Sequence, residues 1–337
     1  MIRRDIRSFY IWIRSSQIPL YIAPIYILLG MLILGSKPGL HQYLMIFAVR
    51  LFYVGVMWGQ VPGFSAMMPH PILSLLVGSM EVLAAILAVV EPRSLLWQLF
   101  LWIGSIAHVA QYMPKGLGRT MRTAPNIIVV IGLLLSLTTP LSGLLGVLAF
   151  PIASVLSLLI RVDPNMRKSR ITPGLVILYT AIFAVSWIIG LLSIYRDLIL
   201  LPLTILILFI PKIGGRDIYR LGTTLSKIVG LLTFPLSLIF SWDAVFHLAM
   251  IGFLALTMIS LCTPLLIPGI IWREIPKLSS IEILLLVVAM LLSALLRFLS
   301  PILAIHMLSM TSGLLVIFVT LYYLYKILKM PSVPVKL

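Results

Sequence analysis

The chain has 337 residues, of which 61% are hydrophobic and only 10% are charged, and its mean hydropathy is +1.16. These values exclude a soluble globular domain, in which about a quarter of the residues are charged. Lysine and arginine outnumber acidic residues by 25 to 9, so the net charge is +16. The basic residues stand in short stretches between apolar runs, where they set membrane topology. We therefore expect no nucleic-acid partner, and contacts with anionic lipids at the cytoplasmic face.

Twelve apolar runs follow one another, and many are close to the roughly 20 residues that a membrane-spanning helix needs. They predict an all-α, polytopic integral membrane protein with 12 transmembrane helices, forming a single domain over residues 1–337. Residues 1–15 are basic and aromatic and are expected to lie along the membrane interface, and residues 327–337 form a cytoplasmic tail. The predicted spans are 18–35, 41–60, 71–90, 95–113, 125–139, 141–160, 173–194, 198–211, 222–241, 244–270, 281–298 and 301–325.

The distribution of basic residues tests this number of spans. With the N-terminus placed inside, nineteen of the 25 lysines and arginines fall in inside segments, four fall in outside segments, and Arg50 and Lys227 remain within spans. Positive residues concentrate on the cytoplasmic side of membrane proteins, so the split predicts that both termini are cytoplasmic. We expect a multi-pass protein of the plasma membrane.

The second and tenth spans share a pattern that begins with a histidine near the outer face. In an ungapped alignment each histidine is followed 21 residues later by a Pro-Gly pair, which at 1.5 Å per residue is roughly the thickness of one bilayer core. The paired residues are His41 with His247, Phe47 with Phe253, and Pro62-Gly63 with Pro268-Gly269. The tenth span comes eight spans after the second, which suggests a fold of three four-helix units.

Two histidines at equal depth on two helices suit one bis-histidine haem b, because neutral imidazole is a good axial ligand. Met45 and Ala48 share the helix face of His41, and Ile251 shares that of His247, so these residues are predicted to line a haem pocket. The same pattern also fits an ordinary contact between helices. Asp243, one turn before His247, is predicted either to accept the other imidazole N–H or to cap the tenth helix.

The segment HQYLMIF at 41–47 resembles the second-helix motif of haem-copper oxidase subunit I, in which the histidine carries a low-spin haem ligand. That family has twelve helices, and its other low-spin ligand lies on the tenth. The spacing of His247, Gly252-Phe253 and Pro268 is similar to motifs of the NnrS family of membrane haem and copper proteins. The resemblance implies a haem at His41 and His247, and it implies that Arg297 in the last outer loop faces the haem propionates. Arg297 also fits a topology-setting or lipid-facing arginine.

The chain departs from the oxidase pattern at the oxygen-reducing centre. It has no histidine between His108 and His247, where that family places copper ligands, and Val245 stands at the position of the high-spin haem ligand. The resemblance therefore implies a low-spin haem without copper, and a protein that is not an oxygen-reducing oxidase.

Other polar residues within the spans also need an explanation. His306 is interpreted as a haem ligand, either extra or in place of one of the pair, as a quinone contact, as a copper ligand together with the other histidines, or as a packing residue. Arg50 lies nine residues after His41 and so faces the other side of its helix. Because unpaired ions are costly in a membrane, we predict a buried Arg50–Glu81 pair that acts as a structural clamp, with proton relay by Glu81 as the alternative. His108 and Gln111 could form an inner site together with His70.

These observations lead to one functional hypothesis and two alternatives. The chain is predicted to be the membrane-embedded b-type haem subunit of a respiratory electron-transfer complex rather than a self-contained enzyme. It would pass electrons between membrane quinol and an extracytoplasmic redox partner, with membrane or extracytoplasmic cytochrome or iron–sulfur subunits as neighbours. The alternatives are a twelve-helix secondary transporter and a cofactor-free membrane scaffold subunit.

Overall fold

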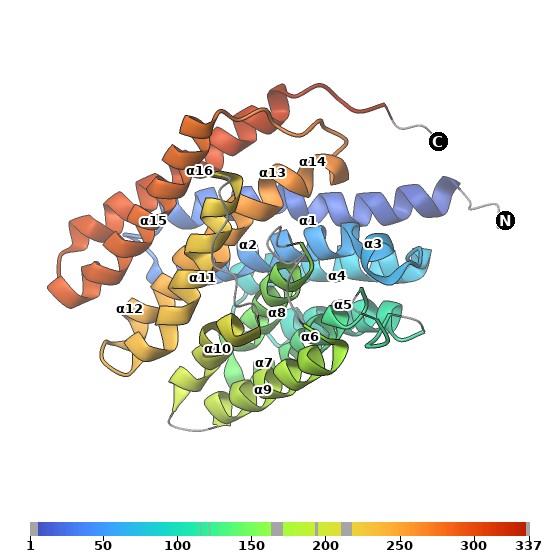
Figure 1. Ribbon diagram of the computed structural model, residues 1–337, viewed down its shortest axis with the longest axis horizontal. Coiled ribbons are helices and arrows are strands. Elements are labelled where there is room, and N and C mark those ends of the chain that lie inside the picture. The colour runs from blue at the N-terminus through green and yellow to red at the C-terminus, as the bar shows by residue number, and fades with distance from the viewer. Residues whose placement is uncertain are drawn as a thin grey trace. The chain divides into compact units, whose positions relative to one another are not determined.

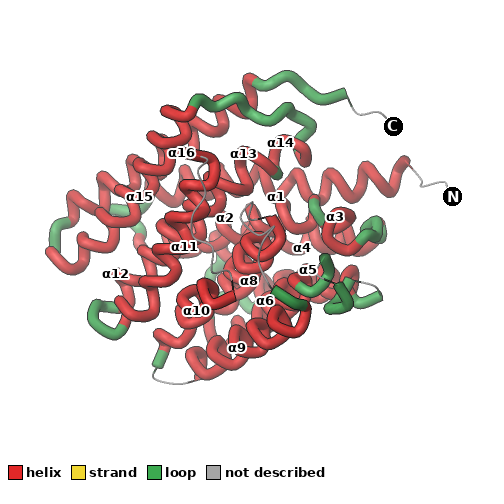
Figure 2. The backbone as a smooth tube through the Cα atoms, in the orientation of Figure 1, coloured by secondary structure: helices red, strands yellow, loops and turns green. Residues whose placement is uncertain are grey.

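The computed structural model describes residues 6–114, 116–120, 122–162, 171–192, 195–209 and 218–334. These residues are all-α, with one isolated β-bridge between Arg273 and Ser332 (Figures 1 and 2). The elements are α1 (Ile6–Leu32), α2 (Pro38–Gly59), α3 (Val61–Ser65), α4 (Pro71–Val90), α5 (Leu96–Tyr112), α6 (Pro125–Leu135), η1 (Ser136–Thr138), α7 (Thr139–Ser142), α8 (Leu144–Val162), α9 (Pro173–Leu192), η3 (Arg196–Leu200), α10 (Leu201–Phe209), α11 (Ile218–Ser237), α12 (Trp242–His247), η4 (Leu248–Ala255), η5 (Met258–Cys262), α13 (Thr263–Leu265), α14 (Ile267–Ile270), α15 (Ser280–Leu303) and α16 (His306–Lys329).

Nine helices in the described part of the chain are long and apolar enough to cross a membrane. They are Ile6–Leu32, Pro38–Gly59, Pro71–Val90, Pro125–Ser142, Leu144–Arg161, Pro173–Leu192, Trp242–Leu265, Ser280–Leu303 and His306–Lys329. The chain is therefore a multi-pass membrane protein. The other three predicted spans, 95–113, 198–211 and 222–241, coincide with α5, with η3 and α10, and with α11, which are shorter or less apolar. Residues 1–5, 193–194, 210–211 and 335–337 of the predicted segments lie outside the described residues.

The contacts divide the chain into two compact units, and the single domain over residues 1–337 stays a prediction. Unit 1 comprises Met1–Ser157 with Pro334–Leu337, and unit 2 comprises Leu158–Val333. The boundary at residue 157 falls inside α8, an uninterrupted apolar helix. No polar linker marks it, so composition carries no signal for the division.

Unit 1 is built on close approaches of helices at glycines. A Cβ atom added to Gly55 of α2 would lie 2.7 Å from the carbonyl oxygen of Ser16, and one added to Gly78 of α4 would lie 2.9 Å from Cα of Ser15. Both partners belong to α1. Helices in a membrane gain little from hydrophobic burial against each other, so small residues that allow such close packing hold the bundle together.

The N-terminal segment packs against α2 from the first turns of α1. Residues 6–15 form the first turns of α1, and Trp12 and Ser15 are buried. Trp12 Nε1 donates a hydrogen bond to the carbonyl oxygen of Trp58 at 2.9 Å, and Trp58 Nε1 donates to Ser15 Oγ at 2.9 Å. These two hydrogen bonds tie the start of α1 to Trp58 of α2, and the interfacial position of residues 1–15 stays a prediction.

In unit 2, the predicted tenth span is not a regular α-helix. After α12 the chain runs through two π-helical stretches, η4 and η5, before the short helices α13 and α14. π-Helical hydrogen bonds join residues i and i+5, so side chains no longer recur with the period of an α-helix. The period that placed Ile251 on the face of His247 therefore does not apply in η4.

The two Pro-Gly pairs form the same local structure in their own units. Pro62-Gly63 lies in α3 and Pro268-Gly269 lies in α14, and both are helices of four or five residues. Each is followed closely by a non-glycine residue in the left-handed region, Ala66 with φ 58° and Trp272 with φ 57°. The pattern shared by the second and tenth predicted spans thus corresponds to a similar turn at the end of each long helix.

Candidate functional site

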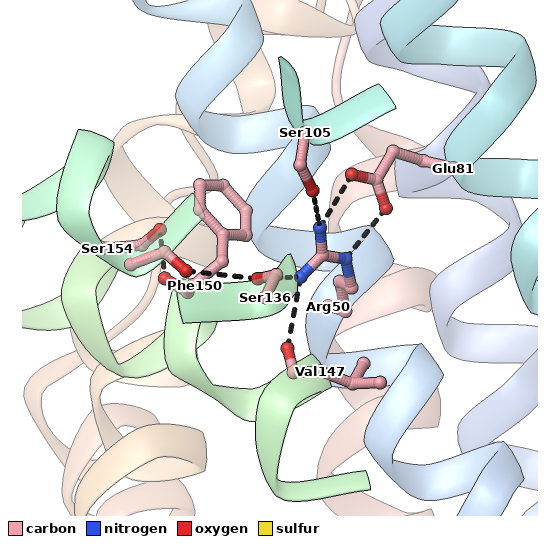
Figure 3. Close-up of polar contacts among 8 residues, drawn as sticks. Arg50, Glu81, Ser105, Ser136, Val147, Phe150 and Ser154 are labelled. Carbon is pink, nitrogen blue, oxygen red and sulfur yellow. Dashed lines mark hydrogen bonds and ion pairs between the residues drawn. The ribbon is translucent and has the colours of Figure 1, made fainter. Parts of the chain in front are cut away.

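The centre of unit 1 is a buried ion pair between α2 and α4. Arg50 and Glu81 both have fully buried side chains. Arg50 Nε lies 2.7 Å from Glu81 Oε2, and Arg50 Nη2 lies 2.7 Å from Glu81 Oε1, so the guanidinium binds the carboxylate through two parallel hydrogen bonds (Figure 3). The structure thus brings together the two residues that the sequence predicts to pair.

The remaining N–H groups of Arg50 reach three further elements. Nη2 donates to Ser105 Oγ on α5 at 2.7 Å, and Nη1 donates both to Ser136 Oγ in η1 at 2.9 Å and to the carbonyl oxygen of Val147 on α8 at 3.1 Å (Figure 3). A guanidinium has five N–H donors, and here all five are used. The Phe150 ring centroid lies 5.3 Å from Arg50 Cζ and closes the remaining side.

The sequence explains why a helical carbonyl is available to Arg50. The carbonyl of Val147 would normally accept from the N–H four residues later, but that residue is Pro151, which lies inside α8 and has no N–H. Gly104 provides the space for the acid, because a Cβ atom there would lie 3.0 Å from Glu81 Cγ. The sequence interpretation missed Ser105, Ser136 and Val147, although Pro151 was a usable signal for the last.

This closed set of hydrogen bonds favours a structural role for the ion pair. Arg50 ties α2 to α4, α5, η1 and α8 in one arrangement, and each oxygen of Glu81 accepts from Arg50. Paired and fully hydrogen-bonded ions are the form in which charge is tolerated within a membrane bundle. A group that carries an ion or proton through cycles must instead exchange partners. Proton relay by Glu81 stays a prediction.

His41 lies near the start of α2 and is held by α1. Its Nδ1 atom is 2.8 Å from the carbonyl oxygen of Gly30. A carbonyl can only accept, so Nδ1 carries the hydrogen and the neutral ring has its lone pair on Nε2. The predicted pocket residue Met45 packs on the same glycine, since a Cβ atom at Gly30 would lie 2.9 Å from Met45 Sδ. Ala48 is fully buried.

His247, the last residue of α12, is held in the same way in unit 2. Its Nδ1 atom lies 2.6 Å from the carbonyl oxygen of Asp243, and its Nε2 atom lies 3.2 Å from Arg297 Nη2. Asp243 is therefore close to the imidazole as predicted, but it accepts through its backbone and not through its carboxylate. It does not cap the helix either, because the N-cap residue of α12 is Ser241.

The remaining predicted histidines do not converge on one site. His306 is the exposed first residue of α16. His70 caps α4, its Nδ1 accepting from the backbone N–H of Ile72 at 3.3 Å, and its own backbone N–H donates to Gln111 Oε1 at 3.0 Å. His108 is buried elsewhere among aromatic rings. Within the described ranges, no three His, Cys, Asp or Glu side chains gather into a group that could hold a metal ion.

The donor chemistry of His41 and His247 fits a haem iron, which binds a deprotonated imidazole nitrogen. In both residues a backbone carbonyl holds Nδ1–H, so Nε2 is the basic nitrogen. At His247 that nitrogen accepts a hydrogen bond from Arg297, which an iron would have to replace.

Comparison of the whole chain with protein families, with curated proteins and with solved structures gives no match. The resemblance to the oxidase and NnrS families stays a prediction.

Proposed function

We propose that the chain is a membrane-embedded b-type haem subunit of a respiratory electron-transfer complex, in which His41 and His247 each supply an axial nitrogen. The observation that supports this is the hydrogen-bond pattern that the two rings share: each donates Nδ1–H to a backbone carbonyl, that of Gly30 or Asp243. Metal-ligating histidines are commonly fixed by such a bond, because it sets the tautomer and raises the basicity of the other nitrogen.

A bound haem would supply one-electron transfer. The protein residues would supply orientation and charge: the carbonyls of Gly30 and Asp243 fix the rings, and the guanidinium of Arg297 offers N–H donors and a positive charge beside His247. Carboxylates are the groups that such a cation prefers, which suits the propionates of a haem. His306, exposed at the start of α16, is the candidate contact for a quinone head group.

The proposed electron path runs between quinol in the bilayer and an extracytoplasmic partner. Apolar helices with short connections leave little chain for a soluble redox domain. The protein would therefore depend on membrane or extracytoplasmic cytochrome or iron–sulfur subunits. We place it in the plasma membrane, with its basic segments against anionic lipids at the cytoplasmic face.

We further propose that α5, α10 and α11 also cross the membrane, giving twelve spans with both termini inside. The 19-to-4 division of basic residues supports this arrangement. The chain offers a direct labelling test, because its only cysteine, Cys262, is buried.

In a Cys262→Ala background, single cysteines on either side of these three helices are expected to alternate in their reaction with an impermeant thiol reagent. Intact cells should label the outside positions and not the inside ones. The outside variants are Arg93→Cys, Arg196→Cys and Ser241→Cys, and the inside variants are Arg119→Cys and Arg216→Cys. Labelling of an inside variant in intact cells, or protection of an outside variant until the cells are opened, would contradict the twelve-span topology.

The haem assignment is tested by the reduced-minus-oxidised visible spectrum of the purified protein and of three variants. His41→Ala and His247→Ala are each expected to lose the b-type signal, because each removes one axial nitrogen. His70→Asn serves as the control: its asparagine keeps the cap on α4, and the signal should be unchanged. A signal that survives both alanine substitutions rules out the ligand assignment.

The alternative of a secondary transporter draws on the buried Arg50–Glu81 pair. Alternating access needs groups that change partners, whereas every N–H of Arg50 is used in one arrangement. The network is better suited to a fixed scaffold. If the spectrum of the wild-type protein shows no haem, the alternative of a cofactor-free scaffold is favoured.

A further inference from the structure

A second buried polar group in unit 1 remains outside the Arg50 network. His108 on α5 is fully buried, and among the described residues no hydrogen-bond partner reaches either of its ring nitrogens. The ring is held by aromatic neighbours: the Trp58 centroid lies 4.8 Å away in an edge-on arrangement, Tyr112 stacks at 5.6 Å, and Phe150 lies at 5.5 Å. Aromatic rings fix the imidazole in place but do not replace a hydrogen-bond donor and acceptor.

A neutral imidazole has one N–H donor and one lone-pair acceptor, and leaving such buried groups unpaired costs about 1–3 kcal/mol each. Native proteins rarely accept this cost without a partner or a role. Arg50 is not available to His108, because its five N–H groups are already used. Arg50 and the His108 ring both contact the Phe150 ring, so the guanidinium charge is close and disfavours a second positive charge there.

The neighbours of His108 along α5 show what the position could do. Trp102, Ser105, His108 and Gln111 recur every third residue, so each lies next to the following one on the helix surface, and the four together wind around half of the helix. Each of the other three makes a hydrogen bond to another element. Trp102 Nε1 donates to Thr139 Oγ1 at 3.0 Å, Ser105 Oγ accepts from Arg50, and Gln111 Oε1 accepts from the backbone of His70. Of these four residues, His108 alone has a side chain for which the described residues provide no hydrogen-bond partner.

We propose that His108 binds a buried water molecule, which supplies the hydrogen-bond partner that the protein does not give to this imidazole. Water is the ligand that fits, because it both donates and accepts and is small enough for a site enclosed by aromatic rings. A cation is disfavoured by Arg50, and an anion would lie against the faces of aromatic rings.

Exchange with this water leaves the imidazole neutral. The proton that the ring nitrogen gives to the water is replaced by one that the water returns to the same nitrogen, so the ring keeps its charge. His108 is not one of the proposed haem ligands, so the water site stands or falls independently of the haem.

The test is nuclear magnetic resonance of the full chain in lipid, with ¹⁵N-labelled histidine. The chain has five histidines, and the His108 ring signals are those that disappear in His108→Phe. Should that variant fail to fold, His108→Gln, which keeps a donor and an acceptor, serves the same assignment. We expect magnetisation transfer from water to the His108 ring, and exchange of its ring N–H with D₂O that is faster than exchange of the α5 backbone amides.

A ring N–H that receives no transfer from water and is as protected as the α5 backbone would overturn the proposal, since His108 would then lie in a dry core. His41 provides an internal reference, because its Nδ1–H is held by the carbonyl of Gly30 in the same unit. Its N–H is expected to exchange more slowly than that of His108.

Discussion

Replacing Arg50 by methionine is expected to destabilise unit 1 by about 3–5 kcal/mol, the cost of breaking a buried ion pair by removing one partner. The substitution leaves the buried carboxylate of Glu81 without its cation. It also removes the donors to Ser105, Ser136 and the carbonyl of Val147. Chemical unfolding of the purified protein in detergent, followed by circular dichroism, measures the loss.

Two controls separate this effect from a general cost of removing an arginine. Arg93→Met at an exposed position should stay within about 0.5 kcal/mol of the wild type. The double variant Arg50→Met with Glu81→Leu should recover part of the loss, because it removes both charges together. The clamp interpretation fails if Arg50→Met is as stable as the wild type, or if the double variant loses the full sum of the two single variants.

Replacing Gly55 by alanine is expected to destabilise unit 1 by about 1–3 kcal/mol, the usual cost of overpacking. The added Cβ atom would lie 2.4 Å from Leu20 Cγ and 2.7 Å from the carbonyl oxygen of Ser16. The leucine side chain can move, but the backbone oxygen can move only if α1 and α2 separate. The midpoint of unfolding in the same detergent measures the change.

The matched control lies on the same helix. Gly39 has no atom within 4 Å of an added Cβ, so Gly39→Ala should leave stability equal to or above that of the wild type, since alanine favours a helix. Equal stability of the two alanine variants would show that the close approach of α1 and α2 at Gly55 is not needed.

The positions of the helices could be predicted where the hydropathy of the sequence alone determines their ends. The predicted span 71–90 corresponds to Pro71–Val90, because prolines and charged residues bound the apolar run. Three features were not predicted from the sequence, for physical reasons. The burial of Trp12 and Ser15 depends on a partner in α2. The π-helices η4 and η5 share the composition of an α-helix, and the boundary between the two units falls within an apolar helix.

Of the candidate site, only the ion pair could be predicted from the sequence, because an unpaired charge within a membrane is costly and needs a partner of opposite charge. An arginine and a glutamate within apolar spans must neutralise each other, so Arg50 and Glu81 could be paired from sequence. The serines that complete the shell come from α5 and η1, and nothing in their local sequence marks them. The isolation of His108 depends on which aromatic side chains surround it, and only the folded bundle determines that.

The central functional claim is that this membrane protein carries haem b, and the most direct measurement is the pyridine haemochrome spectrum of the purified wild-type chain. The preparation should come from cells supplied with haem and with the electron-transfer partners of the protein. We expect a b-type spectrum with one haem per chain, ligated by His41 and His247. A protein that is folded, pure and free of haem under these conditions would contradict the proposal and leave a cofactor-free membrane scaffold.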